Sequence, residues 1–391
     1  MVWEGHGVRG SEVVAALEAN GLKESVGDSR DGEEPAPRSQ LRASSLTLIV
    51  FAPDPRARAS AGRTVARMEG RPPARVILVA PDPDASETGI DARLRVQAQA
   101  RADAPVVRYE EVTLSMRRVA SRHLASLVGA LVVGELPVFL WHMGVLPWGS
   151  SWQGAWSESV DRLIVDSAAT KAPLDDLEAL ASFASARATV AVGDLAFARL
   201  RPWRLGLAEV FQPAARRAGL ARVEGVEIAY PVAADAPSPP GPGALLLGGW
   251  LATRLGWGRA RAGGTDYAVC ERQGGDGRLV FSPVGVGAGD ALRDSGVVAV
   301  TVYLRGPSEG HPVVLSLEPA LGGLAYVDGA SGEEGTIAVP MVDDADALTQ
   351  NLELAPDSVY AESLGRGAEL SRALRRAIEA GADGSDPDSW S

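Results

Sequence analysis

Short apolar runs alternate with helical segments in the first part of the chain. Leu46–Ala52 is a continuous β-forming run, Arg58–Met68 has helical character, and Arg75–Ala80 is a second apolar run. When strands and helices alternate in this way, the strands pair in a parallel or mixed sheet and the helices cross over its faces. The sequence therefore predicts an α/β arrangement for this region.

Further strands and a helix continue the pattern. Glu110–Met116 alternates apolar and polar residues, as a strand with one polar face does. Val138–Trp141 and Arg162–Val165 are apolar enough to be buried strands. We expect an N-terminal α/β sandwich with a mixed sheet over residues 44–168. A helix lying on that sheet is expected from apolar residues at helical spacing, namely Leu124, Leu127, Val128, Leu131 and Val132.

Residues 169–366 are organised differently, because helical segments come first and a series of short strands follows. Gly275-Asp276-Gly277 stands between two of these strands, and an Asp-Gly pair favours a tight hairpin turn. We expect a C-terminal α+β domain with a mainly antiparallel sheet and flanking helices. The remaining parts are predicted as an N-terminal helix over 1–24, a linker over 25–43, and a helical end with an acidic disordered tail over 367–391.

Composition limits the classes of function. The 391 residues carry 38 Lys and Arg against 50 Asp and Glu, a net charge of −12 at pH 7. Since nucleic-acid binding requires an excess of cationic side chains, no nucleic-acid partner is expected. The apolar region His123–Trp148 contains Glu135 and Pro137, which divide it into pieces too short to span a bilayer. Without a secretory signal at the N-terminus, a cytoplasmic protein with no membrane partner is expected.

The sequence contains no motif for catalysis or cofactor binding. Leu46–Met68 has the strand–loop–helix order of a phosphate-binding loop, but Arg63 replaces the lysine and Ala57 replaces the first glycine. The four histidines are far apart, and the single cysteine, Cys270, excludes an intramolecular disulfide and a four-cysteine metal site. We therefore expect a protein that is not an enzyme, with no catalytic residues, no cofactor and no metal site.

An arginine-rich segment around Trp203 carries the main binding signal. Between Asp194 and Arg222, six arginines stand against two acidic residues. Tryptophan buries a large area and guanidinium groups make forked hydrogen bonds, so this composition is typical of protein interfaces. It would equally suit a phosphosugar, and a third possibility is internal ion pairing around a core Trp203. The residues predicted to contact a partner are Arg199, Arg201, Trp203 and Arg204.

A second candidate region lies at the end of the strand Val138–Trp141. Ligand crevices in α/β proteins often lie at the carboxyl ends of strands. The predicted crevice residues are Trp141, His142, Arg162 and Asp166. The alternative for Trp141 and His142 is core packing, and the alternative for Arg162 and Asp166 is a salt-bridged end of the sheet.

Three phrases follow one another along the chain: EEVTLSMRRVASRHLASLVGALVVGELPVFLWHMG at Glu110–Gly144, SVDRLIVDSA at Ser159–Ala168, and LAFARLRPWRLGLAEVF at Leu195–Phe211. Together with LTQNLELAPDSVYAESL at Leu348–Leu364, they strongly resemble the OpcA family, the glucose-6-phosphate dehydrogenase assembly proteins.

The resemblance implies a regulatory role and a partner. It implies an assembly protein or allosteric effector that binds glucose-6-phosphate dehydrogenase and promotes its active, high-affinity form in the oxidative pentose phosphate pathway. The alternative is an α/β sensor or enzyme that itself binds a phosphosugar. The cyanobacterial branch of the family is associated with control through cysteine pairs, which the lone Cys270 rules out within this chain.

Overall fold

The structure is a computed structural model and describes residues 2–23, 46–68, 74–82, 84–101, 104–118, 127–132, 136–144, 160–232, 238–285, 295–305, 312–320, 323–329, 331–353 and 355–381. The chain forms two units. The first comprises Met1–Val165, Thr189–Val192 and Leu352–Leu354, and the second comprises Asp166–Ala188, Gly193–Asn351 and Ala355–Ser391.

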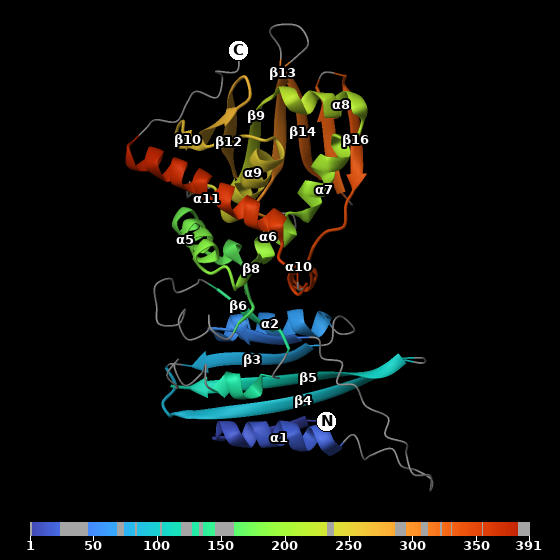
Figure 1. Ribbon diagram of the computed structural model, residues 1–391, viewed down its shortest axis with the longest axis vertical. Helices are drawn as coiled ribbons and strands as arrows, with labels where there is room; N and C mark the ends of the chain where they lie inside the picture. Colours follow the sequence, from blue (N-terminus) through green and yellow to red (C-terminus); the bar gives the residue numbers. More distant parts are fainter. Residues whose placement is uncertain are drawn as a thin grey trace. The chain divides into compact units, whose positions relative to one another are not determined.

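The first unit is built on a mixed sheet whose described strands have the order β1-β4-β5-β3-β2-β6-β7-β8 (Figure 1). The strands from β5 to β7 in this order pair in parallel, whereas β4 is antiparallel to both β5 and β1. The predicted mixed sheet is thus confirmed. The strand bounds are β1 Val2–Gly5, β2 Leu46–Phe51, β3 Ala74–Asp82, β4 Gly89–Arg101, β5 Ala104–Arg117, β6 Val138–His142, β7 Arg162–Val165 and β8 Ala191–Asp194.

The two faces of this sheet are covered by different helices. On one face, Arg75 of β3 forms a buried ion pair with Glu110 of β5 at 2.7 Å and donates a hydrogen bond to the Leu131 carbonyl. The helical residues 127–131 therefore cover this face, and α1 (Gly10–Lys23) joins them, since a Cβ on its Gly10 would touch Leu127. Of the predicted stripe, Leu124 lies outside the described residues, while Val128 and Leu131 are buried.

The opposite face carries α2 (Pro55–Arg67), whose N-terminus is capped by Asp54. The Asp54 carboxylate accepts a hydrogen bond from the Ala57 amide, and Pro55 occupies the first turn, where proline is tolerated. Only part of α2 is buried, at Ala61, Thr64 and Val65. The less buried side of α2, with Arg58 and Gly62, borders a groove whose residues outside α2 belong to β3, β4 and β5.

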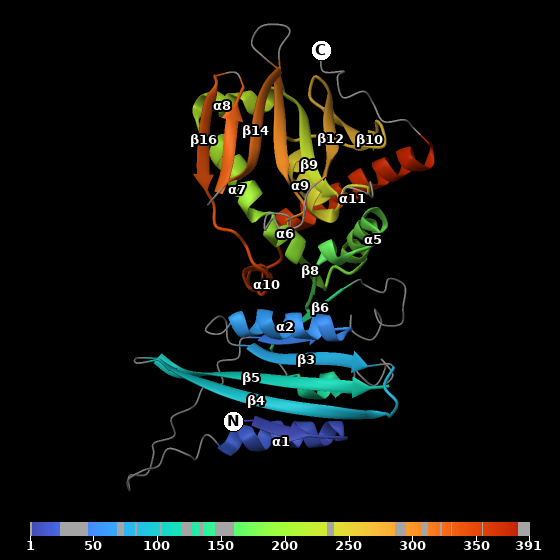
Figure 2. The ribbon, with the colours of Figure 1, turned by 180° about the vertical axis from the view of Figure 1, so that it is seen from behind.

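The second unit is built on a mainly antiparallel sheet with the described strand order β10-β11-β12-β9-β13-β14-β15-β16, in which only β9 and β12 are parallel (Figure 2). This confirms the predicted α+β class. The bounds are β9 Val223–Val232, β10 Ala260–Ala262, β11 Tyr267–Arg272, β12 Gly275–Gly285, β13 Ala299–Arg305, β14 Pro312–Ala320, β15 Gly323–Asp328 and β16 Glu333–Ala338.

Helices cover the apolar face of this second sheet. A Cβ on Gly248 of α9 would lie 3.0 Å from Leu279 and 3.3 Å from both Phe281 and Leu370, so α9 packs between the sheet and α11. The helical bounds are η1 Ser167–Ala169, α5 Pro173–Ala186, α6 Leu195–Arg199, α7 Arg201–Val210, α8 Ala214–Gly219, η2 Leu220–Arg222, α9 Pro242–Arg254, α10 Asp344–Asn351 and α11 Ser358–Glu379.

One detail, the turn between β11 and β12, differs from the sequence-based prediction. The hairpin between β11 and β12 is present, but its turn is Gln273-Gly274 rather than Gly275-Asp276-Gly277, because Arg272 pairs with Gly275. Gly274 (φ +84) and Gly275 (φ +143) provide the positive backbone angles, so Asp276 and Gly277 already belong to β12. α11 continues past residue 366 to Glu379, so the start of the predicted helical end over 367–391 is helical. The predicted linker over 25–43 lies outside the described residues, as do the last ten residues of the predicted tail.

Candidate functional site

The arginine-rich segment folds as two short helices, α6 and α7, that meet at Leu200. Asp194 begins α6 as its N-cap, since its carboxylate accepts a hydrogen bond from the Ala196 amide at 2.9 Å. Pro202 lies in the first turn of α7, where its missing N–H costs no helical hydrogen bond. Consequently the four predicted contact residues are distributed around two helix axes and do not share one face.

Arg199, at the end of α6, is buried and held by two carboxylates. Its guanidinium donates a forked pair of hydrogen bonds to Asp166, at 2.9 and 2.8 Å, and a third to Asp344 at 2.8 Å. These charge-assisted bonds raise the pKa of Arg199 despite the opposing effect of burial. Arg199 therefore joins η1, α6 and α10 within the second unit.

Asp194 lies beside this ion-pair network and is fully buried. In addition to the Ala196 amide, its carboxylate accepts the Ser167 amide at 3.1 Å and faces the Tyr360 hydroxyl at 3.5 Å. Burial, reinforced by the charge of Asp166, raises the pKa of Asp194 to about 6. Sequence reasoning missed Asp194 and Tyr360 as members of one cluster. The available signal was local, an aspartate directly before a helix, and nothing in the sequence links it to a residue 166 positions away.

Trp203 was predicted to contact a partner, but its side chain is buried. It is 0% exposed, and its indole N–H donates a hydrogen bond to the Ser295 hydroxyl at 3.1 Å. An apolar face of α7 that packs inward buries it together with Leu207 and Val210. Trp203 is therefore a core residue in this structure, and a contact made by its ring would require α7 to move.

Arg204 and Arg201 differ in their exposure. Arg204 is partly buried and lies over the Phe197 ring, 4.0 Å from its centroid, and burial lowers its pKa to about 10. Arg201 is exposed, as is Leu205 one turn further along α7, whose relative exposure is 41%. Of the predicted residues, Arg201 alone is fully on the surface, and its neighbour Leu205 was not predicted.

Trp141, His142 and Arg162 are buried in β6 and β7, each at 2% exposure, so their side chains do not line an open crevice. His142 stacks on Phe51 with ring centroids 5.0 Å apart, and burial lowers its pKa to about 4. Arg162 lies over the Phe139 ring. Asp166 belongs to the second unit, where it pairs with Arg199.

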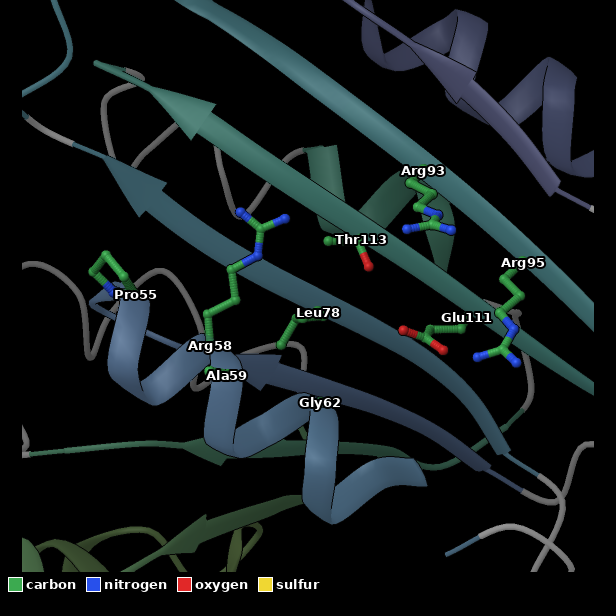
Figure 3. A pocket seen from close by; sticks show the side chains of 9 residues that line it. All are labelled: Pro55, Arg58, Ala59, Gly62, Leu78, Arg93, Arg95, Glu111 and Thr113. Atoms are coloured by element: carbon green, nitrogen blue, oxygen red, sulfur yellow. The ribbon is translucent and has the colours of Figure 1, made fainter. Parts of the chain in front are cut away.

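An open groove lies elsewhere in the first unit, between α2 and the strands β3, β4 and β5 (Figure 3). Its volume is about 400 Å³. No prediction identified it, because its residues come from four separate segments. It is lined by Pro55, Arg58, Ala59, Gly62, Leu78, Arg93, Arg95, Glu111 and Thr113.

Other chemistry is limited in the part of the chain that the structure covers. No group of three His, Cys, Asp or Glu side chains there could hold a metal ion. Cys270 is buried, which raises the pKa of its thiol to about 11 and suppresses the reactive thiolate. None of the described helices has the length and apolar character of a membrane span.

Comparison with known families gives two matches in consecutive parts of the chain. The model described as the glucose-6-phosphate dehydrogenase subunit N-terminal domain matches residues 65–182, and the corresponding C-terminal domain model, also of the OpcA family, matches residues 190–364.

Two curated relatives match about half of this chain at moderate identity. The chain is 30% identical over 189 residues to an OxPP cycle protein OpcA of Nostoc punctiforme, which covers 48% of this chain and 39% of that protein. It is 27% identical over 193 residues to the OpcA protein of Synechocystis, covering 47% and 38% respectively. The matched part thus spans well under half of these relatives.

Among solved structures, an aldose-aldose oxidoreductase from Caulobacter crescentus is similar with a TM-score of 0.47 and 10% identity, covering 86% of this chain and 98% of that one. At this level the similarity carries no argument about activity.

Proposed function

We propose, since this chain belongs to the OpcA family of glucose-6-phosphate dehydrogenase subunits, that it is a non-catalytic protein that binds glucose-6-phosphate dehydrogenase and favours the enzyme's high-affinity form. The observation that supports this most directly is the succession of the two domain matches, residues 65–182 and 190–364, in the order of their names.

Such a role makes simple physical demands. A regulatory subunit shifts a conformational equilibrium only if it binds one state of the enzyme more tightly than the others. It needs a contact surface and no reacting group. The buried polar residues bind groups of this protein itself: Arg199 pairs with Asp166, and Asp194 accepts the Ser167 and Ala196 amides, so these residues fix helices within the second unit.

We place the docking surface on the outward face of α7. Arg201 and Leu205 lie one turn apart on this helix and are both exposed, so they present a guanidinium and an apolar side chain together. Trp203 and Arg199, buried on the other side, support the two helices from within. The proposed surface therefore keeps the predicted segment but replaces its central aromatic residue with Leu205.

The test of the function is a mixing experiment with glucose-6-phosphate dehydrogenase from the same organism. Comigration is measured by size-exclusion chromatography, and the apparent affinity of the enzyme for glucose 6-phosphate is measured with and without this protein. Allosteric couplings are typically about 5–150-fold, so a change in this range is expected. If the proteins elute separately and the kinetics coincide, the proposed function is wrong.

The docking surface is tested by Leu205→Asp. A charge placed in a buried apolar contact should weaken association by about tenfold or more. Ile378→Asp on α11 is the matched control, because Ile378 is exposed to a similar degree, 45% against 41%. Both variants should melt like the parent protein, and only Leu205→Asp should lose binding. Equal binding by the two variants would move the docking surface away from α7.

A second function, a phosphosugar-binding sensor, is favoured by one specific observation, namely the three arginines that line the groove beside α2. The two functions are compatible in one protein, because the groove lies in the first unit and α7 in the second.

A further inference from the structure

The groove beside α2 is constructed from side chains in register across the sheet. Leu78, Thr113 and Arg93 pair in one row across β3, β5 and β4, and Glu111 and Arg95 pair in the next row. Alternate residues of a strand point to the same face, so these polar groups all project from the face that carries α2. The floor of the groove is therefore fixed by strand pairing and not by a loop.

The wall of the groove is one side of α2. Pro55, Arg58, Ala59 and Gly62 recur at helical spacing along this side. Figure 3 shows Arg58 extending from α2 over the sheet, Arg93 next to Thr113, and Glu111 and Arg95 on neighbouring strands. Because Ala59 and Gly62 are small, a bound molecule can approach the helix closely.

The charge of this region is opposite to that of the whole protein. The groove has three arginines and one glutamate, and α2 contains four arginines and no acidic residue, whereas the chain carries −12. Arg93 also pairs with Glu4 at 3.3 Å, but both side chains are more than half exposed. An exposed pair of this kind contributes little free energy and exchanges readily for a better anionic partner.

The polar groups divide into two kinds. Guanidinium groups recognise phosphate oxygens with forked hydrogen bonds. A carboxylate such as Glu111 repels a phosphate but accepts hydrogen bonds from hydroxyl groups, and Thr113 can donate or accept. A groove containing both kinds suits a ligand with a phosphate at one end and hydroxyl groups on the rest of its carbon chain.

We propose that this groove binds a small sugar phosphate, with Arg58 and Arg93 on the phosphate and Glu111 and Thr113 on the hydroxyl groups. A volume of about 400 Å³ lies within the range of about 300–1,000 Å³ that small-molecule sites occupy. The site is independent of the proposed dehydrogenase contact and would make the protein itself a ligand-binding subunit.

Calorimetric titration of the full chain alone tests the proposal, with glucose 6-phosphate, glucose and inorganic phosphate as probes. Glucose 6-phosphate should bind saturably, inorganic phosphate more weakly, and glucose not at all at the same concentrations. Arg58→Ala should weaken glucose 6-phosphate binding by about tenfold, the usual scale for loss of a charge-assisted contact. Arg63→Ala is the matched control, since Arg63 is exposed on the same helix and is not among the groove residues.

Two further variants separate shape and hydroxyl recognition from charge. Gly62→Leu should fill the groove and abolish binding while the protein folds normally, because a Cβ on Gly62 meets no atom within 4 Å and leucine favours helix. Glu111→Ala should weaken glucose 6-phosphate but strengthen inorganic phosphate, since it removes a hydroxyl acceptor and a repelling charge.

Three outcomes would overturn the proposal. The first is an equal loss of glucose 6-phosphate binding in Arg58→Ala and Arg63→Ala, which would indicate that the positive charge of α2 as a whole attracts the phosphate. The second is tighter binding of both phosphates to Glu111→Ala. The third is the absence of saturable glucose 6-phosphate binding to the parent protein; if Arg58→Ala then also loses dehydrogenase binding, α2 is a protein-docking surface instead. Because the titration contains no dehydrogenase, its result does not depend on whether the proposed function is correct.

Discussion

At the scale of single residues, the burial of Asp194 makes the stability of the second unit depend on pH. Its pKa is about 6 in the folded protein and 3.8 in an unfolded chain. Between these values the folded state binds the extra proton, so the contribution of Asp194 to stability is fully present below about pH 4 and is lost as the pH rises through 6. The ionised carboxylate is thus a cost that the folded protein carries at neutral pH.

Asp194→Asn should remove this dependence. Asparagine keeps an oxygen that can accept the Ala196 or Ser167 amide, but it has no charge to desolvate. Relative to the parent, the variant's free energy of unfolding should rise by roughly 2–3 kcal/mol between pH 4 and pH 7. Urea unfolding at several pH values measures this. If the difference in free energy of unfolding between the variant and the parent does not change with pH over this range, Asp194 does not titrate near 6.

Substitution of Arg199 is expected to lower stability more than substitution of an exposed arginine. Arg199→Met removes the cation and leaves Asp166 and Asp344 without it, which should cost roughly 2–4 kcal/mol because Asp344 is half exposed. Arg199→Lys should recover little, since lysine cannot form the fork to Asp166.

The control for Arg199→Met is Arg201→Met, two residues away on an exposed position, which should change stability by less than about 0.5 kcal/mol. The denaturant midpoints of Arg199→Met, Arg199→Lys and Arg201→Met measure these effects. Equal midpoints for Arg199→Met and Arg201→Met would contradict the structural role given to Arg199.

The candidate site residues show where sequence reasoning stops. The composition of the segment from Arg199 to Arg204 predicts forked hydrogen bonds, and Arg199 makes them, but the sequence does not identify their partners. The partners of Arg199 lie 33 and 145 residues away. Helical spacing would have placed Trp203 with Leu207 and Val210 on the inward face, and that signal was outweighed by the association of tryptophan with interfaces.

At the scale of elements, the packing of α9 against α11 rests on small residues. A Cβ on Gly249 would lie 2.4 Å from the Ser363 carbonyl oxygen and 2.6 Å from the Gly367 amide nitrogen, both of them backbone atoms that cannot rotate away. Alanine is intrinsically better than glycine in a helix by about 1 kcal/mol. Tertiary packing is therefore expected to override propensity at this position.

Gly249→Ala should accordingly destabilise the protein by about 1–3 kcal/mol through overpacking. Gly365→Ala on α11 is the matched control. Its Cβ meets no atom within 4 Å, so it should be neutral or stabilise by up to about 1 kcal/mol. Thermal unfolding of the two variants compares them directly. If both variants gain stability, the close approach of the two helices is not present in solution.

The strands with the clearest hydrophobic pattern were the predictable ones, such as Tyr267–Arg272, which is β11 to the residue. β4 and β16 were not predicted. In β4, arginines and glutamines alternate with Ala92, Leu94 and Val96, so one face is charged although the other is buried. The β11–β12 turn lies two residues before its predicted position. Several glycines lie close together there, and only the pairing of Arg272 with Gly275 fixes which residues form the turn.

At the scale of the whole molecule, each unit has its own sheet and, as proposed here, its own task. The groove lies on the first sheet, and α7 belongs to the second unit. The family matches follow the same order, with one domain model over residues 65–182 and the other over 190–364. A ligand in one unit and a partner on the other can act on each other only through a coupling free energy, which is measurable.

The last prediction uses the reciprocity of that coupling. If this protein raises the affinity of the dehydrogenase for glucose 6-phosphate by some factor, then glucose 6-phosphate must tighten the complex by the same factor, because both describe one thermodynamic cycle. The dissociation constant of the complex, measured with and without saturating glucose 6-phosphate, should therefore fall by about 5–150-fold.

Arg58→Ala separates the two places where the sugar phosphate can act. If glucose 6-phosphate acts only on the enzyme, it tightens the complex by the same factor in the variant as in the parent. If it also acts through the groove beside α2, this factor is smaller in the variant. A complex whose dissociation constant is the same with and without glucose 6-phosphate would exclude an effect on substrate affinity, and the protein's role would then be assembly of the enzyme alone.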